Sequence, residues 1–343
     1  MFSYDFNEIF TVQSNIPYFD DLLHSFNINT SPTSPKRTGI SLGFFLDRKL
    51  TIDTHGKSRV NLMLYFDPSN GNIEFSYPWL RPISARLIYN HEAHFDFYFN
   101  NAYLRFSNIV AEGWELIDIF RSLLLTSLIE AGMYMIHGGA VEIGQTGLLI
   151  PSFGNTGKTI TTWMLAKRGA RFLTDEFAIL DSNGQCFGFP CSSLISSDLA
   201  KEAQIALSRR QQVSLVFNDL RSRILSTRFY PGGIKLYPDK HFETISEAKV
   251  DKVVFIQNGE DFVKEIDRDR AATMIGAIQN YEMNWRANPY IIAHSYFDSN
   301  PDVEEISRKE KDLVESQLSK ISRFYVVSSR PGKHHEAIWK LAQ

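Results

Sequence analysis

One short segment combines the residue types that a phosphate-binding loop requires, in the order Ser152-Phe153-Gly154-Asn155-Thr156-Gly157-Lys158-Thr159. Such a loop needs glycine where a Cβ would collide or where φ must be positive, so that backbone N–H groups can turn towards an anion. It also needs a lysine for the β- and γ-phosphates and a hydroxyl for Mg²⁺. The opening glycine of the usual motif is Ser152 here. The segment predicts a site for ATP, or another nucleoside triphosphate, with Mg²⁺, formed by Gly154, Asn155, Thr156, Gly157, Lys158 and Thr159.

The residues on either side of this segment favour a functional loop. An apolar strand is predicted over residues 148–151 and a helix over residues 158–168, with Gly169 ending the helix. The loop would therefore lead into a helix N-terminus, where N–H groups and the helix dipole favour an anion. The alternative is a helix-initiating turn with a solvated lysine.

Two adjacent carboxylates, Asp175 and Glu176, lie in a second strand that is predicted over residues 171–180. In open α/β sheets, ligands bind outside the carboxyl ends of parallel strands, so we expect the pair to face the phosphate loop. One carboxylate can reach Mg²⁺ directly or through water, and the other can accept a proton from an attacking hydroxyl. The alternative is a strand end that runs into water.

A histidine precedes the first strand of this region, in the sequence His137-Gly138-Gly139. At the junction of a helix and a strand, a single histidine more often caps or packs than catalyses. Its role therefore depends on the wider pattern of motifs.

The remaining pattern predicts an α/β protein of two domains, with a β-rich N-terminal domain over residues 1–110 and a catalytic domain over residues 111–343. Short aromatic and β-branched runs separated by turn residues predict an antiparallel sheet or small barrel, with strands over 60–66, 72–77, 85–89, 94–99 and 103–106. Asn100-Asn101 suits a hairpin turn before the last of these strands. Apolar residues at helical spacing predict a long helix over 111–135. Further helices are expected over 197–210, 216–225, 269–281, 309–319 and 334–342, and strands over 250–257 and 322–328.

Composition and net charge limit the kinds of binding partner that we expect for this chain. The chain has 343 residues and a formal net charge of -3, which argues against sequence-independent binding of nucleic acid. The two cysteines, Cys186 and Cys191, fit neither a zinc site nor a disulfide framework and are expected to be reduced thiols. Asp5 and Glu8 interrupt the N-terminal residues, so no secretory signal is predicted. The most apolar stretch, 114–136, carries four charged residues and predicts no membrane span. We expect a cytoplasmic protein without nucleic-acid or membrane partners.

Taken together, these motifs resemble the catalytic core of HPr kinase/phosphorylase. That family carries His-Gly before its first core strand, then a phosphate loop that ends in Gly-Lys-Ser or Gly-Lys-Thr. A helix ending in Arg-Gly follows, and then a strand ending in two acids. The order and spacing agree over about 45 residues, 137–181. The resemblance implies an α/β fold whose P-loop core is of the phosphoenolpyruvate carboxykinase type.

The resemblance also implies roles. Lys158 would hold the β- and γ-phosphates and Thr159 would ligate Mg²⁺. Asp175 would be the general base and a metal neighbour, Glu176 a metal partner, and His137 a group near Asp175. Lys158 is expected to be exposed before nucleotide binds. Members of the family often form ring-like homo-oligomers, so the resemblance makes a homo-oligomer possible.

Three features depart from the family pattern. The first loop glycine is Ser152, and Glu176 replaces an aspartate. The glycine-rich segment that handles the protein substrate is not found, although residues 228–233, with Arg228 or Lys235 reaching the phosphates, can stand in its place. HPr itself is therefore not the expected substrate.

The expected function is an ATP-dependent kinase that phosphorylates a hydroxyl acceptor, which can be a serine in a protein or peptide, or a small molecule. One alternative is a nucleotide-responsive binding module, in which nucleotide orders residues 190–245 without phosphoryl transfer. Another is a lyase like the carboxykinases, which would need further metal ligands and two nucleotide-stacking aromatic residues that the sequence does not assign.

Overall fold

The computed structural model describes residues 2–6, 9–16, 40–60, 63–77, 82–90, 94–107, 116–188, 192–225, 233–298, 302–330 and 332–343. The chain divides by contacts into two compact units. Unit 1 consists mainly of Ile28–Met135 and Met283–Ser316, and unit 2 mainly of Ile136–Glu282 and Gln317–Gln343. Large sheets and helices in both units give the protein an α/β fold.

This division does not coincide with the boundary expected between residues 110 and 111. The helix that follows the N-terminal strands, α3 (Leu116–Glu130), belongs to the core of unit 1. The Phe120 ring packs edge-on against Phe44 with 5.7 Å between ring centroids. A helix that buries its apolar face against the sheet belongs to that sheet's unit.

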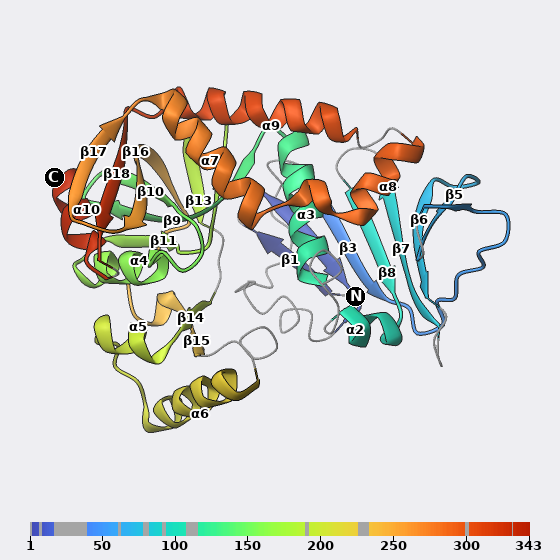
Figure 1. The fold of residues 1–343 in the computed structure, drawn as a ribbon, viewed down its shortest axis with the longest axis horizontal. Coiled ribbons are helices and arrows are strands. Elements are labelled where there is room, and N and C mark those ends of the chain that lie inside the picture. Colours follow the sequence, from blue (N-terminus) through green and yellow to red (C-terminus); the bar gives the residue numbers. More distant parts are fainter. Residues whose placement is uncertain are drawn as a thin grey trace. The chain divides into compact units, whose positions relative to one another are not determined.

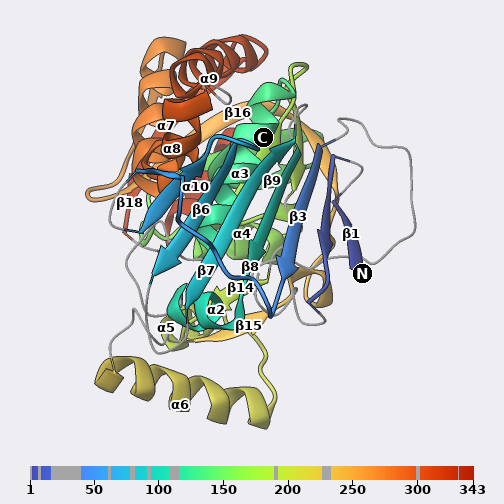
Figure 2. The ribbon, with the colours of Figure 1, turned by 90° about the vertical axis from the view of Figure 1, so that its right-hand side faces the viewer.

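Unit 1 is built on an eight-stranded sheet in the order β1-β2-β3-β8-β7-β6-β5-β4 (Figure 2). Strands β4 to β8 pair antiparallel, as predicted. Strand β3 runs parallel to both β2 and β8, so the sheet is mixed. The strands are β1 (Phe2–Phe6), β2 (Phe10–Ser14), β3 (Ile40–Leu46), β4 (Ser58–Arg59), β5 (Leu64–Asp67), β6 (Asn72–Tyr77), β7 (Ile83–Asn90) and β8 (His94–Phe99).

The strand predicted over 103–106 is wrong, because Asn101–Ser107 form a helix, α2. Asn100 Oδ1 accepts a hydrogen bond of 2.9 Å from the backbone N–H of Tyr103, so Asn100 caps this helix and does not turn a hairpin. The Tyr103 ring packs against Phe75 and Phe97 inside unit 1. Its aromatic character therefore reflects burial in a core and not membership of a strand.

Unit 2 is built on an eight-stranded sheet. Seven of its strands follow the order β10-β9-β12-β13-β16-β18-β17, and the eighth, β11, also pairs with β9 (Figure 1). Strand β10 runs parallel to β16, and β16 runs parallel to β18, so their carboxyl ends meet at one edge. Both β10 and β11 are antiparallel to β9 and therefore share a direction, as predicted. The strands are β9 (Tyr134–Ile143), β10 (Thr146–Pro151), β11 (Arg171–Thr174), β12 (Phe177–Leu180), β13 (Gln185–Gly188), β16 (Glu247–Asn258), β17 (Phe262–Ile266) and β18 (Arg323–Ser329).

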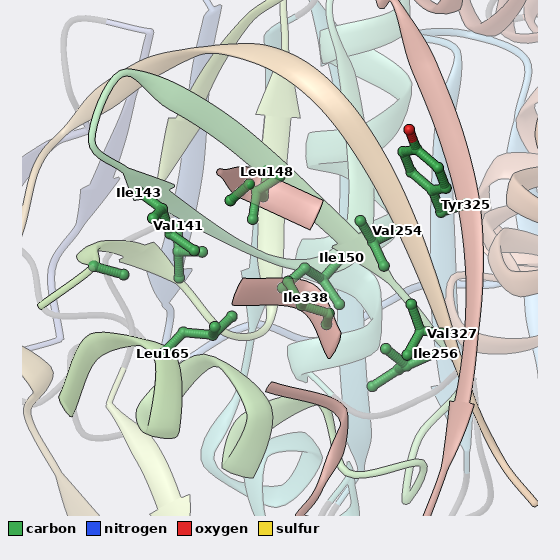
Figure 3. Packing of buried hydrophobic residues seen from close by; sticks show 12 residues of the cluster. Val141, Ile143, Leu148, Ile150, Leu165, Val254, Ile256, Tyr325, Val327 and Ile338 are labelled. Atoms are coloured by element: carbon green, nitrogen blue, oxygen red, sulfur yellow. The ribbon is translucent and has the colours of Figure 1, made fainter. Parts of the chain in front are cut away.

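A buried cluster joins this sheet to the two helices α4 (Lys158–Lys167) and α10 (His334–Ala342). Ile150 of β10, Val254 of β16 and Val327 of β18 pack with Leu165 of α4 and Ile338 of α10 (Figure 3). Each of these side chains is at most 1% exposed. Burying a side chain of this size contributes about 1.5–3 kcal/mol, so the cluster fixes α4, and with it the loop at the start of α4, on the sheet.

A second cluster surrounds Trp163 on α4 and joins it to a small substructure. This substructure comprises α5 (Ser197–Glu202), α6 (Arg209–Leu225), β14 (Ser193–Ile195) and β15 (Ile234–Leu236). The helix predicted over 197–210 is wrong in its extent, because α5 ends at Glu202 and the chain turns at Gln204, whose φ is 49°. Residues 203–208 are not helical, and helix α6 begins at Arg209 and includes the predicted helix over 216–225.

Three further predicted helices are present, whereas α8 (Pro289–Asp298) was not predicted and α3 ends at Glu130, short of the predicted residue 135. Helices α7 (Arg268–Glu282) and α10 lie where they were predicted, and α9 (Val303–Leu318) begins earlier than expected. Cys186 is a buried, free thiol in β13, whereas Cys191 and Arg228 lie outside the described residues. Among the helices of the described residues, none is long and apolar enough to span a membrane.

Candidate functional site

The loop between β10 and α4 contains two residues in the left-handed region of backbone conformation. Asn155 has a φ of 62° and Gly157, the N-cap of α4, has a φ of 96°. Glycine adopts this left-handed region without steric cost, and asparagine tolerates it better than most residues. Gly154 does not have a positive φ, so Asn155 and not Gly154 is the first of the two left-handed residues in the loop. The predicted helix start at Lys158 is confirmed.

Lys158 is buried, in contrast to the exposed lysine that was expected. Its side chain is 7% exposed and its Nζ lies 2.7 Å from Nε2 of His137. An ammonium group has only donors, so the imidazole Nε2 accepts in this hydrogen bond. His137 lies within β9, and not before the strand as expected, and it holds the loop lysine directly. His137 was expected to lie near Asp175. The Asp175 carboxyl group interacts with the charge of Lys158, which lowers the pKa of Asp175.

The C-terminal end of α7 clamps both the histidine and the loop. Gln279 Oε1 accepts a hydrogen bond of 2.9 Å from the backbone N–H of His137. Glu282 Oε1 accepts one of 2.6 Å from the backbone N–H of Gly154, and its other oxygen lies 3.9 Å from His137 Nδ1. Residues three apart lie on one helix face, which explains why Gln279 and Glu282 reach the same place. Sequence reasoning missed both residues.

Asp175 is the buried carboxyl group of the site. Burial raises its pKa from 3.8 to about 6, although hydrogen bonds to Ser193 and Thr159 and the charge of Lys158 act in the opposite direction. The Ser193 hydroxyl also accepts a hydrogen bond of 2.9 Å from Nε1 of Trp163, so the α4 core holds this partner in place. Ser193 is another residue that sequence reasoning missed.

The two acids lie at a break in the predicted strand over 171–180. The chain bends at Asp175 and Glu176, between β11 and β12. The register of β11 against β9 shifts between Phe172 and Thr174, which marks a bulge. Bulges redirect side chains and are common beside functional sites. Glu176 is half-buried, and its charge adds to the rise in the pKa of Asp175.

Close approach of β9 to α4 depends on Gly139. A Cβ at this position would lie 2.5 Å from Cγ2 of Thr162 and 3.5 Å from Cγ of Lys158. We therefore predict that Gly139→Ala lowers the free energy of unfolding by about 1–3 kcal/mol, because the added methyl group overpacks this contact. Urea denaturation would measure the change. Gly276→Ala in α7 is the matched control, since a Cβ there meets nothing within 4 Å and a helix favours alanine. Equal effects of the two substitutions would contradict the prediction.

Glu282 places a carboxylate where the loop would receive a phosphate oxygen. Its oxygen already accepts the Gly154 N–H, so an anion that binds the loop must displace it or bind beside it. We predict that Glu282→Gln tightens binding of pyrophosphate on the order of tenfold, because the like charge is removed. Isothermal calorimetry would measure this, with Glu247→Gln, an exposed glutamate at the start of β16, as control. Unchanged or weaker binding in Glu282→Gln would show that the carboxylate does not compete.

The predicted metal-binding residues form only part of a coordination shell. The hydrogen bond between Asp175 and Thr159 brings two of them together, and Glu176 is adjacent in sequence. Across the described ranges, no three His, Cys, Asp or Glu side chains gather closely enough to hold a metal ion. Mg²⁺ is usually held by one or two carboxylates together with substrate phosphates and water, so this oxygen set suits it.

Comparison with protein-family models and with curated proteins finds no match. Among solved structures, the chain is similar to the Hpr(Ser) kinase/phosphatase from Coxiella burnetii. The identity is 13%, the alignment covers 48% of this chain and 98% of that chain, and the TM-score is 0.22. A TM-score this low carries no argument about function, which therefore has to rest on the geometry of the site.

Proposed function

We propose that this protein is a phosphotransferase that moves the γ-phosphoryl group of ATP, or another nucleoside triphosphate, to a hydroxyl acceptor with Mg²⁺. The observation that carries the proposal is the position of Asp175. It is a buried carboxyl group with a pKa of about 6, hydrogen-bonded to the hydroxyl that follows the loop lysine. A base of this kind suits proton abstraction near neutral pH, whereas nucleotide binding alone requires none.

The residues of the loop fit a triphosphate. The helix N-terminus at Lys158 offers backbone N–H groups, and two left-handed residues shape the turn before it. Ser152 Oγ is buried and has no hydrogen-bond partner among the residues that the structure describes. An unpaired buried hydroxyl costs free energy, and a phosphate oxygen would satisfy it. The serine in place of the usual glycine is therefore compatible with an anion site.

The side chains around the loop have separable roles in this proposal. Lys158 offsets negative charge on the β- and γ-phosphates, and its contact with His137 keeps the ammonium group in position. Asp175 takes the proton from the acceptor hydroxyl. Thr159, Asp175 and Glu176 would hold Mg²⁺, which when bound neutralises charge on the phosphate oxygens. In phosphoryl transfer the protein mainly positions the reactants and stabilises charge, which these residues can do.

Two exposed aromatic rings flank the loop on the side of Glu282. Phe153 is 41% exposed and Tyr281 is 77% exposed, and their ring centroids are 5.7 Å apart in an edge-on arrangement. Exposed aromatic side chains beside a site commonly contact a ligand. We assign these two rings to the binding of the acceptor, whether it is a serine-containing peptide or a small molecule.

The test is ATP consumption as a function of acceptor and pH. Consumption should require a hydroxyl-bearing acceptor, for which serine peptides and small polyols are the first probes. The value of kcat/KM should rise as pH increases through about 6, because Asp175 must be ionised to accept a proton. ATP binding without consumption under any of these conditions, or a rate independent of pH between 5 and 7, would contradict the proposal.

A further inference from the structure

Two exposed aromatic rings and a carboxylate lie together beside the loop. Phe153 belongs to the loop, whereas Tyr281 and Glu282 are the last two residues of α7. The planes of the Phe153 and Tyr281 rings are inclined by 77°, so the rings meet edge to face and the largely exposed Tyr281 ring is open to a ligand. The face of an aromatic ring carries negative charge and attracts a cation that lies within about 6 Å of its centre.

Glu282 brings a negative charge to these rings and is held in place by the loop. Its Oε1 accepts the hydrogen bond of 2.6 Å from the Gly154 N–H, and its side chain is 19% exposed. The other oxygen, Oε2, makes no hydrogen bond within the part of the chain that the structure describes. A fixed carboxylate with one uncommitted oxygen can pair with a cation without giving up its bond to the loop.

The C-terminal end of α7 adds to this negative potential. A helix C-terminus carries about half a negative charge on its carbonyl groups, and basic side chains in the last turn commonly offset it. The last turn of α7 has no basic residue. A phosphate or an acidic peptide would be repelled here, and a neutral ring would gain nothing from the carboxylate or the helix end. A cation gains from the carboxylate, the helix end and the aromatic rings together.

His137 shows how close this carboxylate lies to the loop lysine. Its Nε2 is 2.7 Å from Lys158 Nζ, and its Nδ1 is 3.9 Å from Glu282 Oε2. The imidazole ring therefore lies between the lysine and the carboxylate. In the proposed function Lys158 holds the β- and γ-phosphates, so a cation at Glu282 and a hydroxyl group at the γ-phosphate can belong to one small molecule or to neighbouring residues of one peptide.

We propose that the phosphoryl acceptor carries a cationic group close to its hydroxyl, and that Phe153, Tyr281 and Glu282 bind this cation. An amino alcohol has this chemistry, and so does a serine that adjoins a lysine or arginine in a peptide. The hydroxyl oxygen attacks the γ-phosphorus, Asp175 takes its proton and the nucleoside diphosphate leaves, so the cation itself is unchanged. The role as acceptor rests on the proposed phosphotransferase function, whereas binding of the cation requires neither nucleotide nor transfer.

Binding is measured first, by calorimetry on the full chain without nucleotide, using two pairs of probes that differ only in charge. One pair is choline and the neutral alcohol in which carbon replaces its nitrogen. The other is the blocked tripeptide Gly-Ser-Lys and the same peptide with norleucine in place of lysine. In at least one pair the cation should bind about tenfold or more tightly than its neutral partner. The pair that shows the difference identifies the source as a small molecule or a peptide.

Two substitutions locate the cation. Glu282→Gln keeps an acceptor for the Gly154 N–H and removes the charge, so it should weaken the cationic probe at least about tenfold while tightening pyrophosphate. A general loss of structure would weaken both ligands. Tyr281→Leu should weaken the cationic probe about threefold or more and leave Mg²⁺-ATP binding unchanged. Tyr296→Leu is the matched control, since Tyr296 is 80% exposed and also meets a phenylalanine, Phe297, edge to face.

The outcomes separate this inference from the proposed function. Equal binding of the cationic and neutral probes in both pairs, or cation binding that Glu282→Gln leaves intact, overturns the inference. If Tyr281→Leu weakens Mg²⁺-ATP and not the cationic probe, the rings contact the nucleobase and the inference is wrong. Phosphoryl transfer to neutral acceptors alone would overturn it and leave the phosphotransferase function standing. Specific cation binding without ATP consumption for any acceptor would uphold the cation site and refute the phosphotransferase function.

Discussion

Replacing Lys158 with alanine is expected to lower phosphoryl transfer by about 10²–10³-fold. The lysine is the only charged side chain within the eight residues of the loop, and removal of one preorganised donor to developing charge typically has an effect of this size. The measurement is single-turnover transfer from labelled ATP to an acceptor that the wild-type protein uses.

Burial of Lys158 calls for a second variant. Its side chain is 7% exposed, so alanine leaves a cavity and deprives His137 of a hydrogen-bond donor. Lys158→Met keeps most of the buried volume and removes only the charge. Both variants should lose transfer to a similar degree, while Lys158→Met should retain more stability in thermal melts. Wild-type turnover in either variant would refute the role of the lysine.

Asp175→Asn is expected to have opposite effects on activity and on stability. Transfer should fall by about 10²–10⁴-fold, because asparagine cannot accept the acceptor's proton. The free energy of unfolding at pH 7.5 should rise by up to about 3 kcal/mol, because the wild-type fold buries an ionised carboxylate at this pH. Such a trade between stability and activity is common at functional sites.

The sign of this stability effect follows from the two pKa values. The folded chain keeps Asp175 protonated up to about pH 6, whereas the unfolded chain ionises it near 3.8. Between these values the folded state binds more protons, so stability falls as pH rises, and the full cost is present above pH 6. Urea denaturation at pH 3.5 and pH 7.5 should therefore show a larger gain for Asp175→Asn at the higher pH.

Asp239→Asn, which changes an exposed carboxylate, provides the control and should show no such pH dependence. An Asp175→Asn variant that is destabilised equally at pH 3.5 and pH 7.5 would show that the carboxyl group is not held at a raised pKa. Normal transfer by the same variant would separately exclude its role as the base.

The local part of the site can be predicted from sequence because it depends on neighbours along the chain. Glycine and asparagine at the turn, an apolar strand before it and a helix after it are all encoded within residues 146–167. The shared direction of β10 and β11 also follows from the strand order around the loop, and it places Asp175 beside Thr159. These relations need no knowledge of distant segments.

The remaining contacts of the site come from segments far away in sequence. Glu282 reaches the loop amide of Gly154 across 128 residues, and Gln279 reaches His137 across 142. Nothing in the composition of α7 distinguishes these two side chains from ordinary polar residues at a helix end. The burial of Lys158 also depends on a distant contact, since β9 passes close to this side chain at Gly139. Packing between elements, and not local propensity, decides these features.

The measurement that tests the central claim most directly is a calorimetric titration of Mg²⁺-ATP into the wild-type protein, Lys158→Met and Asp175→Asn, supported by thermal unfolding. At 100 times its dissociation constant, bound nucleotide should add about 2.7 kcal/mol to the free energy of unfolding. The account predicts this gain in the wild type and in Asp175→Asn, and its loss in Lys158→Met. If no nucleoside triphosphate binds or stabilises the wild type, the loop is a structural turn and the proposed phosphotransferase function is wrong.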